Sequence, residues 1–592
     1  MEVTRIFDIL EKLQTQFPDK PNILGYKEKK GVWRDVSVRE FAYKVNYVSA
    51  ALLEKGIKPG DTIALIANNR PEWNYVDYGC QQIGVISVPI FPTISQHDMD
   101  FIFGHAEVKG VFFSSIDILR KIKSITAHQR LEFISTFNID DEVDSFPKIL
   151  ELGKTNYEKH KAEIERIKAT IKSTDLVSIL YTSGTTGVPK GVMLSHRNIL
   201  SNALACETLV PFESSWNYLS FLPLNHVYER MFGTLILYLG ISVYYAQAVE
   251  TVADNLQEIK PNIIVTVPRL LERVYDRLLS RGATLTGFKK KLYDWSLKLA
   301  SQYEPDGANG AFYEMKRKIA DKLIYSKWRE ALGGNLRFIV SGGAALQPRL
   351  SRAFTCADIH TFQGYGLTET SPVISTTFYG KGNNTFGTVG KVIKDTTVKI
   401  AEDGEILVKG PGVMMGYYKN QAATDEAIDK DGWFHTGDIG KIENEFLKIT
   451  DRKKEIFKTS SGKYITPLVL ENKLKECRFV EQCMIVGEGQ KFASALIVPS
   501  FEYLREWAAE KGINYTTNEE MAQNAEMKKE INMFIREMNK ELASYEHLKR
   551  VELVSHPWSV ESGELTPKMS MKRKVILEKN KALIDKIFAV EE

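Results

Sequence analysis

The chain has 592 residues, of which 43% are hydrophobic, and its formal net charge is +3. This length allows more than one domain and a large core, and the nearly balanced charge gives no protein-wide field for binding nucleic acid. The scattered cysteines (Cys80, Cys206, Cys356, Cys477 and Cys483) show neither metal-ligand spacing nor a disulfide pattern, so we expect a reducing, cytoplasmic environment.

Two segments are compared with the patterns of a signal peptide and of a membrane-spanning helix, and neither segment has the pattern. Residues 1–20 lack a basic stretch followed by an apolar run, so we expect no signal peptide. The most apolar window, residues 231–246, is shorter than the ~20 residues of a membrane span. It is also interrupted by Gly233 and Gly240, and we predict that it is buried core.

Strand-like apolar runs alternate with amphipathic helical patterns through the first part of the chain. The runs at residues 61–68, 262–267 and 336–343 are each followed by a helical pattern. Strand, helix and strand in succession indicate helices that cover a largely parallel sheet. We therefore predict the α/β class, with a large N-terminal domain made of layered α/β subdomains.

The second part of the chain changes character. Residues 388–417 are rich in Gly and alternating β-formers, which predicts a small, mostly antiparallel β unit at the end of the large domain. The last 135 or so residues indicate a small α+β domain with its own sheet. We place the boundary at residues 451–454, which gives an N-terminal domain of residues 1–451 and a mobile C-terminal domain of residues 452–592.

A basic helical insert is expected at about residues 281–332. Residues 281–329 hold eleven basic and five acidic side chains, a net charge of +6. Its two helical patterns carry apolar stripes at Phe288, Leu292, Trp295 and Leu299 and at Phe312, Met315, Ile319 and Leu323. One interpretation is a helical hairpin that packs on the domain and exposes a basic face. The other is a surface that contacts an anionic membrane.

The string "YTSGTTGVPKGVMLSH", residues 181–196, has the composition of a phosphate-binding loop. Hydroxyls and exposed glycine N–H groups can hold oxyanions. The string nevertheless departs from the NTPase pattern GxxxxGK[ST], because Pro189 and Gly191 stand where Gly and Ser or Thr belong. The phosphate it would hold therefore serves a different chemistry.

This string closely resembles the signature loop of the adenylate-forming superfamily of acyl-CoA synthetases, luciferases and peptide-synthetase adenylation domains. Further motifs of that superfamily follow in order: "FLPLNHVYER" (221–230), "SGGAAL" (341–346), "QGYGLTET" (363–370), "GWFHTGD" (432–438), "DRKKEIFKTSSGKYITP" (451–467) and "LTPKMSMKRK" (565–574). By analogy, "LPLNHVYER", the long insert and the ending "TPKMSMKRK" are most similar to long-chain fatty acid–CoA ligases.

The resemblance implies that ATP activates a long-chain fatty acid to acyl-AMP with release of pyrophosphate, after which CoA accepts the acyl group. ATP, Mg²⁺ and CoA would be the cofactors. A fatty acyl-AMP ligase, an acyl-carrier-protein synthetase and a shorter-chain or aryl acid–CoA ligase are alternatives. A non-catalytic lipid-binding or scaffolding protein would not need the whole set of motifs.

The resemblance also implies roles for individual residues. Thr368 would contact the α-phosphate, Glu369 would carry Mg²⁺, and His226 would lie near the substrate carboxylate. Nucleotide-binding residues would be Thr182, Ser183, Gly184, Thr185, Thr186, Gly187 and Lys190 at the β- and γ-phosphates, Gly342, Gly343, Ala344, Gly364, Tyr365 and Gly366 at adenine, and Asp438 and Arg452 at the ribose. Each also has a plain structural alternative, such as a packed aromatic or a turn residue.

Two positions depart from the patterns of the resembling families. Some long-chain members place a Trp gate four residues after the His, where this chain has Arg230. The general pattern P-x-x-x-x-G-K would put the catalytic lysine at Arg573, which Lys572 and Lys574 flank. The ending typical of long-chain members favours Lys572.

The resemblance implies that the small domain rotates after adenylation about Lys454. The rotation would bring a CoA channel to the active site, formed by Ser461, Gly462, Lys463 and Tyr464. We expect substrates rather than nucleic acid as partners. The basic insert is the candidate for peripheral contact with the inner face of a membrane.

Overall fold

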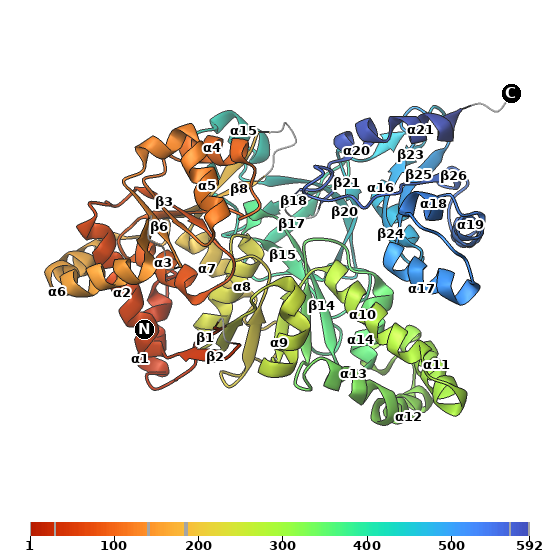
Figure 1. Cartoon of the computed structure of the whole chain (residues 1–592), viewed down its shortest axis with the longest axis horizontal. Coiled ribbons are helices and arrows are strands. Elements are labelled where there is room, and N and C mark those ends of the chain that lie inside the picture. Colours follow the sequence, from red (N-terminus) through yellow and green to blue (C-terminus); the bar gives the residue numbers. More distant parts are fainter. Residues whose placement is uncertain (1, 29–30, 139–142, 183–187, 567–569, 590–592) are drawn as a thin grey trace. The chain divides into compact units, whose positions relative to one another are not determined.

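The computed structural model describes residues 2–28, 31–138, 143–182, 188–566 and 570–589 (Figure 1). The chain divides into two compact units, and each is described by itself. The larger holds residues 1–399, 407–436 and 442–448; the smaller holds residues 400–406, 437–441 and 449–592. Among the described residues, no helix is long and apolar enough to cross a membrane.

Two large sheets organise the larger unit. Among the described residues, one has nine strands in the order β16 (Lys391–Val392), β15 (Val373–Thr376), β14 (His360–Gly366), β13 (Phe338–Ser341), β12 (Ile263–Thr266), β10 (Asn217–Ser220), β11 (Ser242–Tyr245), β1 (Leu24–Lys27) and β2 (Trp33–Val36). The other has eight, in the order β19 (Gly416–Tyr417), β9 (Lys190–Ser195), β8 (Leu176–Thr182), β4 (Ile86–Pro89), β3 (Thr62–Ile66), β5 (Gly110–Phe113), β6 (Phe133–Thr136) and β7 (Asp144–Ser145).

The centre of each sheet is parallel, which confirms the predicted α/β class. Strand β3 pairs in parallel with β4 and β5, and β13 pairs in parallel with β12 and β14. Helices follow these strands as the patterns predict: α3 (Pro71–Gln82) follows β3, α10 (Pro268–Ala283) follows β12 and α14 (Pro348–Cys356) follows β13. The apolar window at 231–246 is confirmed as core, because α8 (Val227–Tyr238) and β11 are almost wholly buried.

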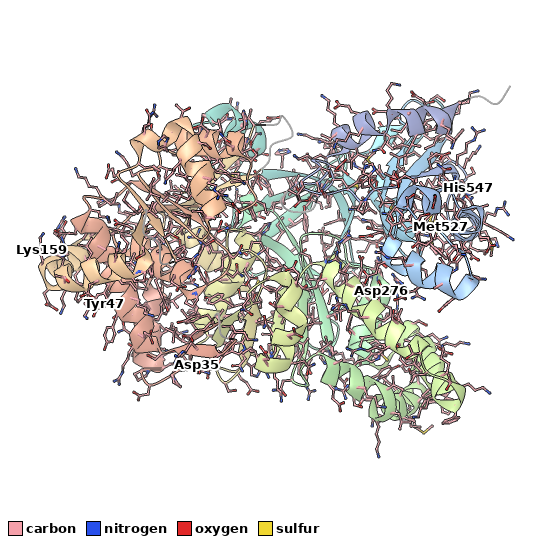
Figure 2. The ribbon with its side chains drawn as sticks, viewed as in Figure 1. Asp35, Tyr47, Lys159, Asp276, Met527 and His547 are labelled. Atoms are coloured by element: carbon pink, nitrogen blue, oxygen red, sulfur yellow. The ribbon has the colours of Figure 1, made fainter. Side chains whose placement is uncertain are left out.

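Eight further helices of the larger unit pack around these sheets (Figure 1). They are α1 (Asp8–Gln16), α2 (Val38–Glu54), α4 (Gln96–His105), α5 (Ile116–Ser124), α6 (Phe146–Thr170), α7 (His196–Ala205), α9 (Val252–Ile259) and α15 (Gln421–Ala427). Helix α2 lies close along α6: Tyr47 and Tyr157 make a ring contact at 5.9 Å, near Lys159 (Figure 2). A Cβ at Gly153 would come within 1.8 Å of the Tyr47 carbonyl oxygen, so only glycine allows this approach.

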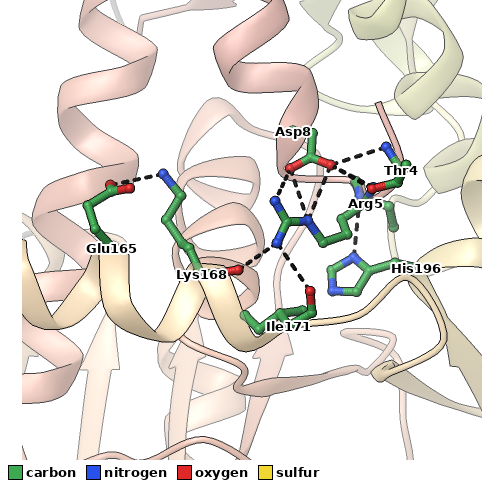
Figure 3. A network of polar contacts seen from close by, with 8 residues as sticks. Thr4, Arg5, Asp8, Glu165, Lys168, Ile171 and His196 are labelled. Atoms are coloured by element: carbon green, nitrogen blue, oxygen red, sulfur yellow. Dashed lines mark hydrogen bonds and ion pairs between the residues drawn. The ribbon is translucent and has the colours of Figure 1, made fainter. Parts of the chain in front are cut away.

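The last residue of the glycine-rich string, His196, has a structural role. The N–H of Ile6 donates to its Nδ1 at 3.3 Å, and burial lowers the pKa of His196 to about 3, so the ring stays neutral. Arg5 lies beside it, paired with Asp8 and donating to the carbonyl oxygens of Lys168 and Ile171 (Figure 3). These bonds attach the start of α1 to the end of α6 and to the residue after β9.

The smaller unit has a three-stranded sheet among the described residues, in the order β24 (Val480–Val486), β25 (Ala493–Pro499) and β26 (Leu548–Leu553), and a hairpin of β22 (Phe457–Lys458) and β23 (Tyr464–Ile465). Its helices are α16 (Pro467–Leu474), α17 (Phe501–Lys511), α18 (Asn518–Ala522), α19 (Ala525–Asn539), α20 (Arg573–Lys579) and α21 (Lys581–Phe588). They enclose a separate hydrophobic core. Strands β17 (Thr397–Ile400), β18 (Glu405–Lys409), β20 (Phe434–Glu443) and β21 (Phe446–Arg452) run from one unit into the other.

The basic insert is helical, but its predicted packing face is only partly correct. In α11 (Gly287–Ser301), Leu299 is buried as expected, whereas Phe288 is 79% exposed. In α12 (Ala311–Ala320), the apolar stripe faces solvent rather than the core. The opposite side of the continuous segment through α13 (Ser326–Ala331) is buried instead, at Ala320, Ile324, Tyr325 and Trp328. Helical periodicity identifies an apolar stripe but not which side packs.

Helix α8 buries two ionisable side chains next to each other, Glu229 and Arg230. Arg230 donates to both carboxylate oxygens of Asp77, at 2.7 and 3.0 Å, and this buried pair compensates the desolvation of both charges. No ion pair to Glu229 is found in the described part of the chain; it accepts from the hydroxyls of Tyr218 at 2.7 Å and Ser220 at 2.5 Å. Burial raises the pKa of Glu229 to about 8, against the lowering effect of these two bonds.

Glu229→Gln should make the protein less sensitive to alkaline pH. A carboxyl whose folded pKa is raised contributes its stability below the unfolded pKa of about 4.5 and loses it as pH rises through about 8. Glutamine keeps the neutral form at every pH. The variant's gain in unfolding free energy should grow by on the order of 2 kcal/mol between pH 6 and pH 9, measured by urea denaturation; the exposed Glu250→Gln is the control. Parallel pH profiles for wild type and Glu229→Gln would contradict the assignment.

Candidate active site

The predicted adenine-binding segments meet at one edge of the nine-stranded sheet. Strands β13 and β14 are parallel and in register, with Ser341 opposite Gln363. Residues Gly342 to Ala344 therefore continue from the same edge as Gly364 to Gly366, and the carboxyl ends of parallel strands are where open α/β sheets bind ligands. The sequence motifs "SGGAAL" and "QGYGLTET" are thus neighbours in space.

Two glycines at this edge are required by the backbone. Gly343 has φ of +79°, a conformation that favours glycine. A Cβ at Gly366 would come within 1.7 Å of the Pro372 carbonyl oxygen. By contrast, a Cβ at Gly364 would meet nothing closer than 3.8 Å. Tyr365, between the last two, is half-buried and pairs with Ser375 across the ladder.

A tyrosine links the predicted metal and phosphate residues. Thr368 is buried and Glu369 half-buried in the turn after β14. The Tyr417 hydroxyl donates to Glu369 Oε1 at 3.0 Å, and Lys190 Nζ lies 4.9 Å from the centre of the Tyr417 ring. Burial, and then the Glu369 carboxylate, raise the pKa of Tyr417, so its hydroxyl remains a neutral donor. Strand pairing holds this arrangement, because Tyr417 lies opposite Val192 of β9.

The glycine-rich string joins two antiparallel strands. Strands β8 and β9 pair in a ladder that ends with Thr182 opposite Lys190. An NTPase loop would lead from a strand into a helix, so the missing NTPase pattern accompanies a different local fold. The predicted phosphate-binding residues Ser183, Gly184, Thr185, Thr186 and Gly187 lie outside the described residues.

His226 precedes α8, and its Nδ1 accepts the backbone N–H of Tyr228 at 3.1 Å. Nδ1 is therefore unprotonated, which leaves Nε2 to carry the proton in the neutral ring. Its ring also contacts Phe91 edge-on at 6.5 Å. Arg230, at the expected gate position, is fixed in the core by Asp77. The cavity beside that pair is about 10 Å³ and has no room for an acyl chain.

The predicted ribose residues belong to the smaller unit, together with the predicted hinge. Asp438 is buried, and Arg452 Nε lies 3.8 Å from its Oδ1. Lys453 pairs with Asp403 at 2.5 Å and with Glu405 at 2.9 Å. Ion pairs thus hold the segment that precedes the predicted pivot.

The residue on the other side of the pivot is also held. Glu455 accepts from Arg573 Nε at 2.8 Å, and Arg573 Nη2 donates to both oxygens of the buried Glu471, at 2.7 and 2.8 Å. Lys454 itself is exposed between these two fixed neighbours. Both neighbours of Lys454 are thus held by partners within the smaller unit, and the pivot at Lys454 stays a prediction.

The predicted CoA-channel residues form the turn and second strand of the β22–β23 hairpin. The turn closes through a bond from the Gly462 N–H to the Thr459 carbonyl at 2.9 Å, and Gly462 has φ of +77°. Ser461 Oγ lies 2.9 Å from Thr459 Oγ1. Lys463 Nζ is 5.9 Å from the Tyr545 ring, and Tyr464 is exposed.

The structure separates the three basic residues of the C-terminal motif. Arg573 is largely buried by its two acidic partners, whereas Lys572 and Lys574 are exposed. The Lys572 N–H donates to the Glu564 carbonyl at 2.7 Å, which fixes the backbone just before α20. The position where the general family pattern has lysine is thus engaged in structural ion pairs.

Comparison with known proteins agrees with this geometry. Residues 10–418 match the family described as AMP-binding enzyme, and residues 454–592 match the AMP-binding enzyme C-terminal domain. Long chain acyl-CoA synthetase 7, peroxisomal, of Arabidopsis thaliana is 32% identical over 95% of this chain and 86% of its own length. The chain belongs to the long-chain acyl-CoA synthetases of the AMP-binding enzyme family.

Other relatives have similar coverage. The human long-chain-fatty-acid–CoA ligase 1 is 31% identical to this synthetase over 99% of this chain and 87% of its own. Among solved structures, an anthranilate CoA ligase in complex with anthranoyl-AMP superposes with a TM-score of 0.72 at 18% identity, covering 98% of each chain. At that identity the likeness supports the fold alone, and it confirms the large and small α/β units.

Sequence reasoning did not identify Tyr417 or the ion pairs of Arg573 as parts of the site. Tyr417 belongs to a two-residue strand, and its partner Glu369 lies 48 positions away. The local sequence offered one signal for Tyr417, the aromatic pair Tyr417 and Tyr418 at the end of the Gly-rich β segment. Arg573 stood out as a departure from a pattern, but its acidic partners are remote in sequence.

Tyr417→Phe should impair the synthetase by releasing Glu369. Removing a hydrogen bond to a charged group should lower the rate of ATP-dependent acyl-AMP formation about tenfold and raise the Mg²⁺ concentration needed for half-maximal rate. Melting temperature should change little. Tyr418→Phe, one residue further, is the matched control. An unchanged Mg²⁺ requirement in Tyr417→Phe would show that the tyrosine does not position this carboxylate.

Proposed function

We propose that this synthetase activates a long-chain fatty acid with ATP and transfers the acyl group to CoA. A carboxylate oxygen of the fatty acid bonds to the α-phosphorus of ATP, and the bond to pyrophosphate breaks. The CoA sulfur then bonds to the acyl carbonyl carbon, its proton is lost to solvent, and AMP leaves. The observation that carries the proposal is the convergence of Lys190, Tyr417 and Glu369 beside the glycine-rich edge of the nine-stranded sheet.

We infer an adenine nucleotide from the groups that the predicted binding residues offer to its base, ribose and phosphates. The backbone at Gly343 and Gly364 is open enough for a flat base to approach, whereas Gly342 faces the Tyr228 ring; Tyr365 would stack on the base. Thr368 would donate to the α-phosphate, and Asp438 and Arg452 would bind the ribose. Lys190, Thr182 and the residues 183–187 would hold the β- and γ-phosphates, which leave together as pyrophosphate.

Mg²⁺ fits the donors at this site. The described residues contain no cluster of three or more His, Cys, Asp or Glu side chains, so a cation here would rely on one carboxylate and on substrate phosphates. That is the usual environment of Mg²⁺. Glu369 would hold it, oriented by Tyr417, and the bound cation would neutralise charge on the phosphates. His226 would lie near the fatty acid carboxylate.

Lys572 is the proposed catalytic lysine. The ion pairs of Arg573 support this choice, because they hold the neighbouring backbone while leaving Lys572 exposed. A lysine charge would stabilise the negative charge that develops as the carboxylate meets the α-phosphate. Lys574, which is also exposed and lies on the first turn of α20, is the alternative.

The second half-reaction would follow a rotation at Lys454, with Ser461, Gly462, Lys463 and Tyr464 contributing to the CoA channel. Domain steps of this kind often limit turnover. The boundary between the domains, at residues 451–454, is part of the same proposal. We also propose a cytoplasmic location: all five cysteines are buried and free, as expected in a reducing compartment.

The substrate assignment is tested by the products formed. Fatty-acid-dependent exchange of ATP with pyrophosphate reports the first half-reaction, and acyl-CoA formation across acids from acetate to oleate reports the chain length. Exchange and acyl-CoA should both be greatest with long chains. Acyl-AMP release without CoA dependence would instead favour an acyl-AMP ligase, and the absence of exchange would favour a binding protein.

Lys572→Ala should abolish acyl-AMP formation and spare the second half-reaction. The rate of acyl-AMP formation should fall by at least about a hundredfold, as expected when a charge that stabilises the transition state is removed. Supplied acyl-AMP should still be converted to acyl-CoA. Lys574→Ala, on the same turn, is the matched control and should retain both activities. Normal acyl-AMP formation in Lys572→Ala, with loss in Lys574→Ala, would transfer the role to Lys574.

Lys454→Pro should slow the thioester half-reaction more than adenylation. Proline fixes φ and thus restricts rotation at this position. Lys454→Ala removes the side chain but leaves the rotation free, so it should retain both half-reactions. The two rates can be compared by single-turnover measurements with ATP and with supplied acyl-AMP. Equal losses in both halves of Lys454→Pro would argue against a pivot here.

A further inference from the structure

The outer face of the basic insert combines exposed apolar and basic side chains. We name as the outer face Phe312, Met315, Lys318, Ile319, Lys322, Leu323 and Lys327, which recur at helical spacing along α12, the π-helical turn Asp321–Tyr325 and α13. Its apolar members are substantially exposed: Phe312 66%, Met315 53%, Ile319 49% and Leu323 41%. Isolated exposed apolar residues are ordinary, but a continuous helical stripe indicates a surface that something covers.

Two of the acidic side chains of this segment, Glu314 and Asp321, form ion pairs with arginines, whereas Glu330 near its end is exposed. Glu314 pairs with Arg317 at 2.8 Å, and Asp321 pairs with Arg329 at 2.5 Å. Both arginines also bond to the segment that follows α14, where Arg317 meets Asp358 at 3.0 Å. Glu314 and Asp321 are thus neutralised by arginines that also bond to the body of the larger unit.

The charge that remains exposed along this segment is positive, because three lysines stand against the single exposed Glu330. Lys318, Lys322 and Lys327 are exposed there, and no ion pair to them is found among the described residues. Lys316 Nζ lies 4.2 Å from the Phe312 ring, so its stem covers the apolar stripe while its charge stays near the surface. A partner must accept both apolar contacts and several positive charges.

We propose that the outer face docks on the surface of an anionic lipid bilayer. Lysines at the margin would meet the headgroups, while Phe312, Ile319 and Leu323 enter the boundary between headgroups and acyl chains. Charge complementarity favours lipid over a second copy of this chain, because two copies would bring the same lysines together. Helices α11 and α12 lie side by side at the edge of the larger unit (Figure 1). The exposure of the apolar side chains shows that the outer face is accessible.

This docking is reversible and depends on both kinds of side chain. One short apolar stripe is a weak anchor, and binding becomes appreciable only when basic residues add their attraction to anionic headgroups. Such contact would keep the proposed synthetase where long-chain acids dissolve. The docking itself does not depend on the catalytic assignment.

The test is co-sedimentation of the full-length protein with vesicles, without ATP or fatty acid. Wild type should bind vesicles with roughly a third phosphatidylglycerol, bind poorly to pure phosphatidylcholine, and dissociate at high salt. The triple variant Phe312→Ser, Ile319→Ser, Leu323→Ser should reduce the partition coefficient about tenfold. The triple variant Lys318→Gln, Lys322→Gln, Lys327→Gln should reduce it similarly and remove most of the salt dependence.

A matched control replaces apolar residues of similar exposure elsewhere. Ile116, Val249 and Met533 are 48%, 49% and 50% exposed, and their combined change to Ser should leave vesicle binding intact. All variants should melt as wild type does and make acyl-CoA normally from detergent-dispersed fatty acid. Binding of the apolar variant equal to that of wild type, or no binding by wild type, would overturn the proposal. So would a concentration-dependent dimer abolished by the same variant, which would assign the face to a second copy.

Discussion

The parallel register of β13 and β14 is the constraint on which the proposed site depends. Because Ser341 and Gln363 are opposite each other, two motifs separated in sequence leave the sheet side by side. Glu369 follows directly from this edge, and β19 then brings Tyr417 to it across the second sheet. A shift of one residue in the β13–β14 ladder would turn the side chains of one strand to the other face and displace the turn that carries Glu369.

Much of the fold was predictable because its signals are local. Apolar runs with helical patterns between them indicate parallel strands at β3 and β4, and the same alternation indicates β12 and β13. The insert was less predictable: an apolar stripe shows that α12 is amphipathic, but the packed side is set by Tyr325 and Trp328 and by arginines that bond to remote segments. The hairpin of β8 and β9 was likewise hidden, since a glycine-rich string specifies no strand partner.

The candidate site shows the same difference between local sequence signals and contacts with remote segments. Residues within motifs could be identified by resemblance, yet their partners could not, because a hydrogen bond such as Tyr417 to Glu369 joins distant segments. The C-terminal motif illustrates the limit. Arg573 occupies the position of the general catalytic lysine, and only its burial against Glu455 and Glu471 distinguishes a structural arginine from the exposed lysine beside it. Breaking one partner of such a buried pair costs about 3–5 kcal/mol.

The insert and the C-terminal motif share one arrangement of charges. In each, arginines take up the acidic groups on the inner side, through planar guanidinium pairs that remain charged at all relevant pH. In each, lysines are left on the outside, where a flexible ammonium can meet a mobile anion. At Lys572 that anion would be the phosphate and carboxylate of a reacting pair, and on the outer face of α12 it would be a lipid headgroup. In both places the arginines therefore stabilise the fold, whereas the lysines stay exposed to contact the anions of a substrate or of a lipid surface.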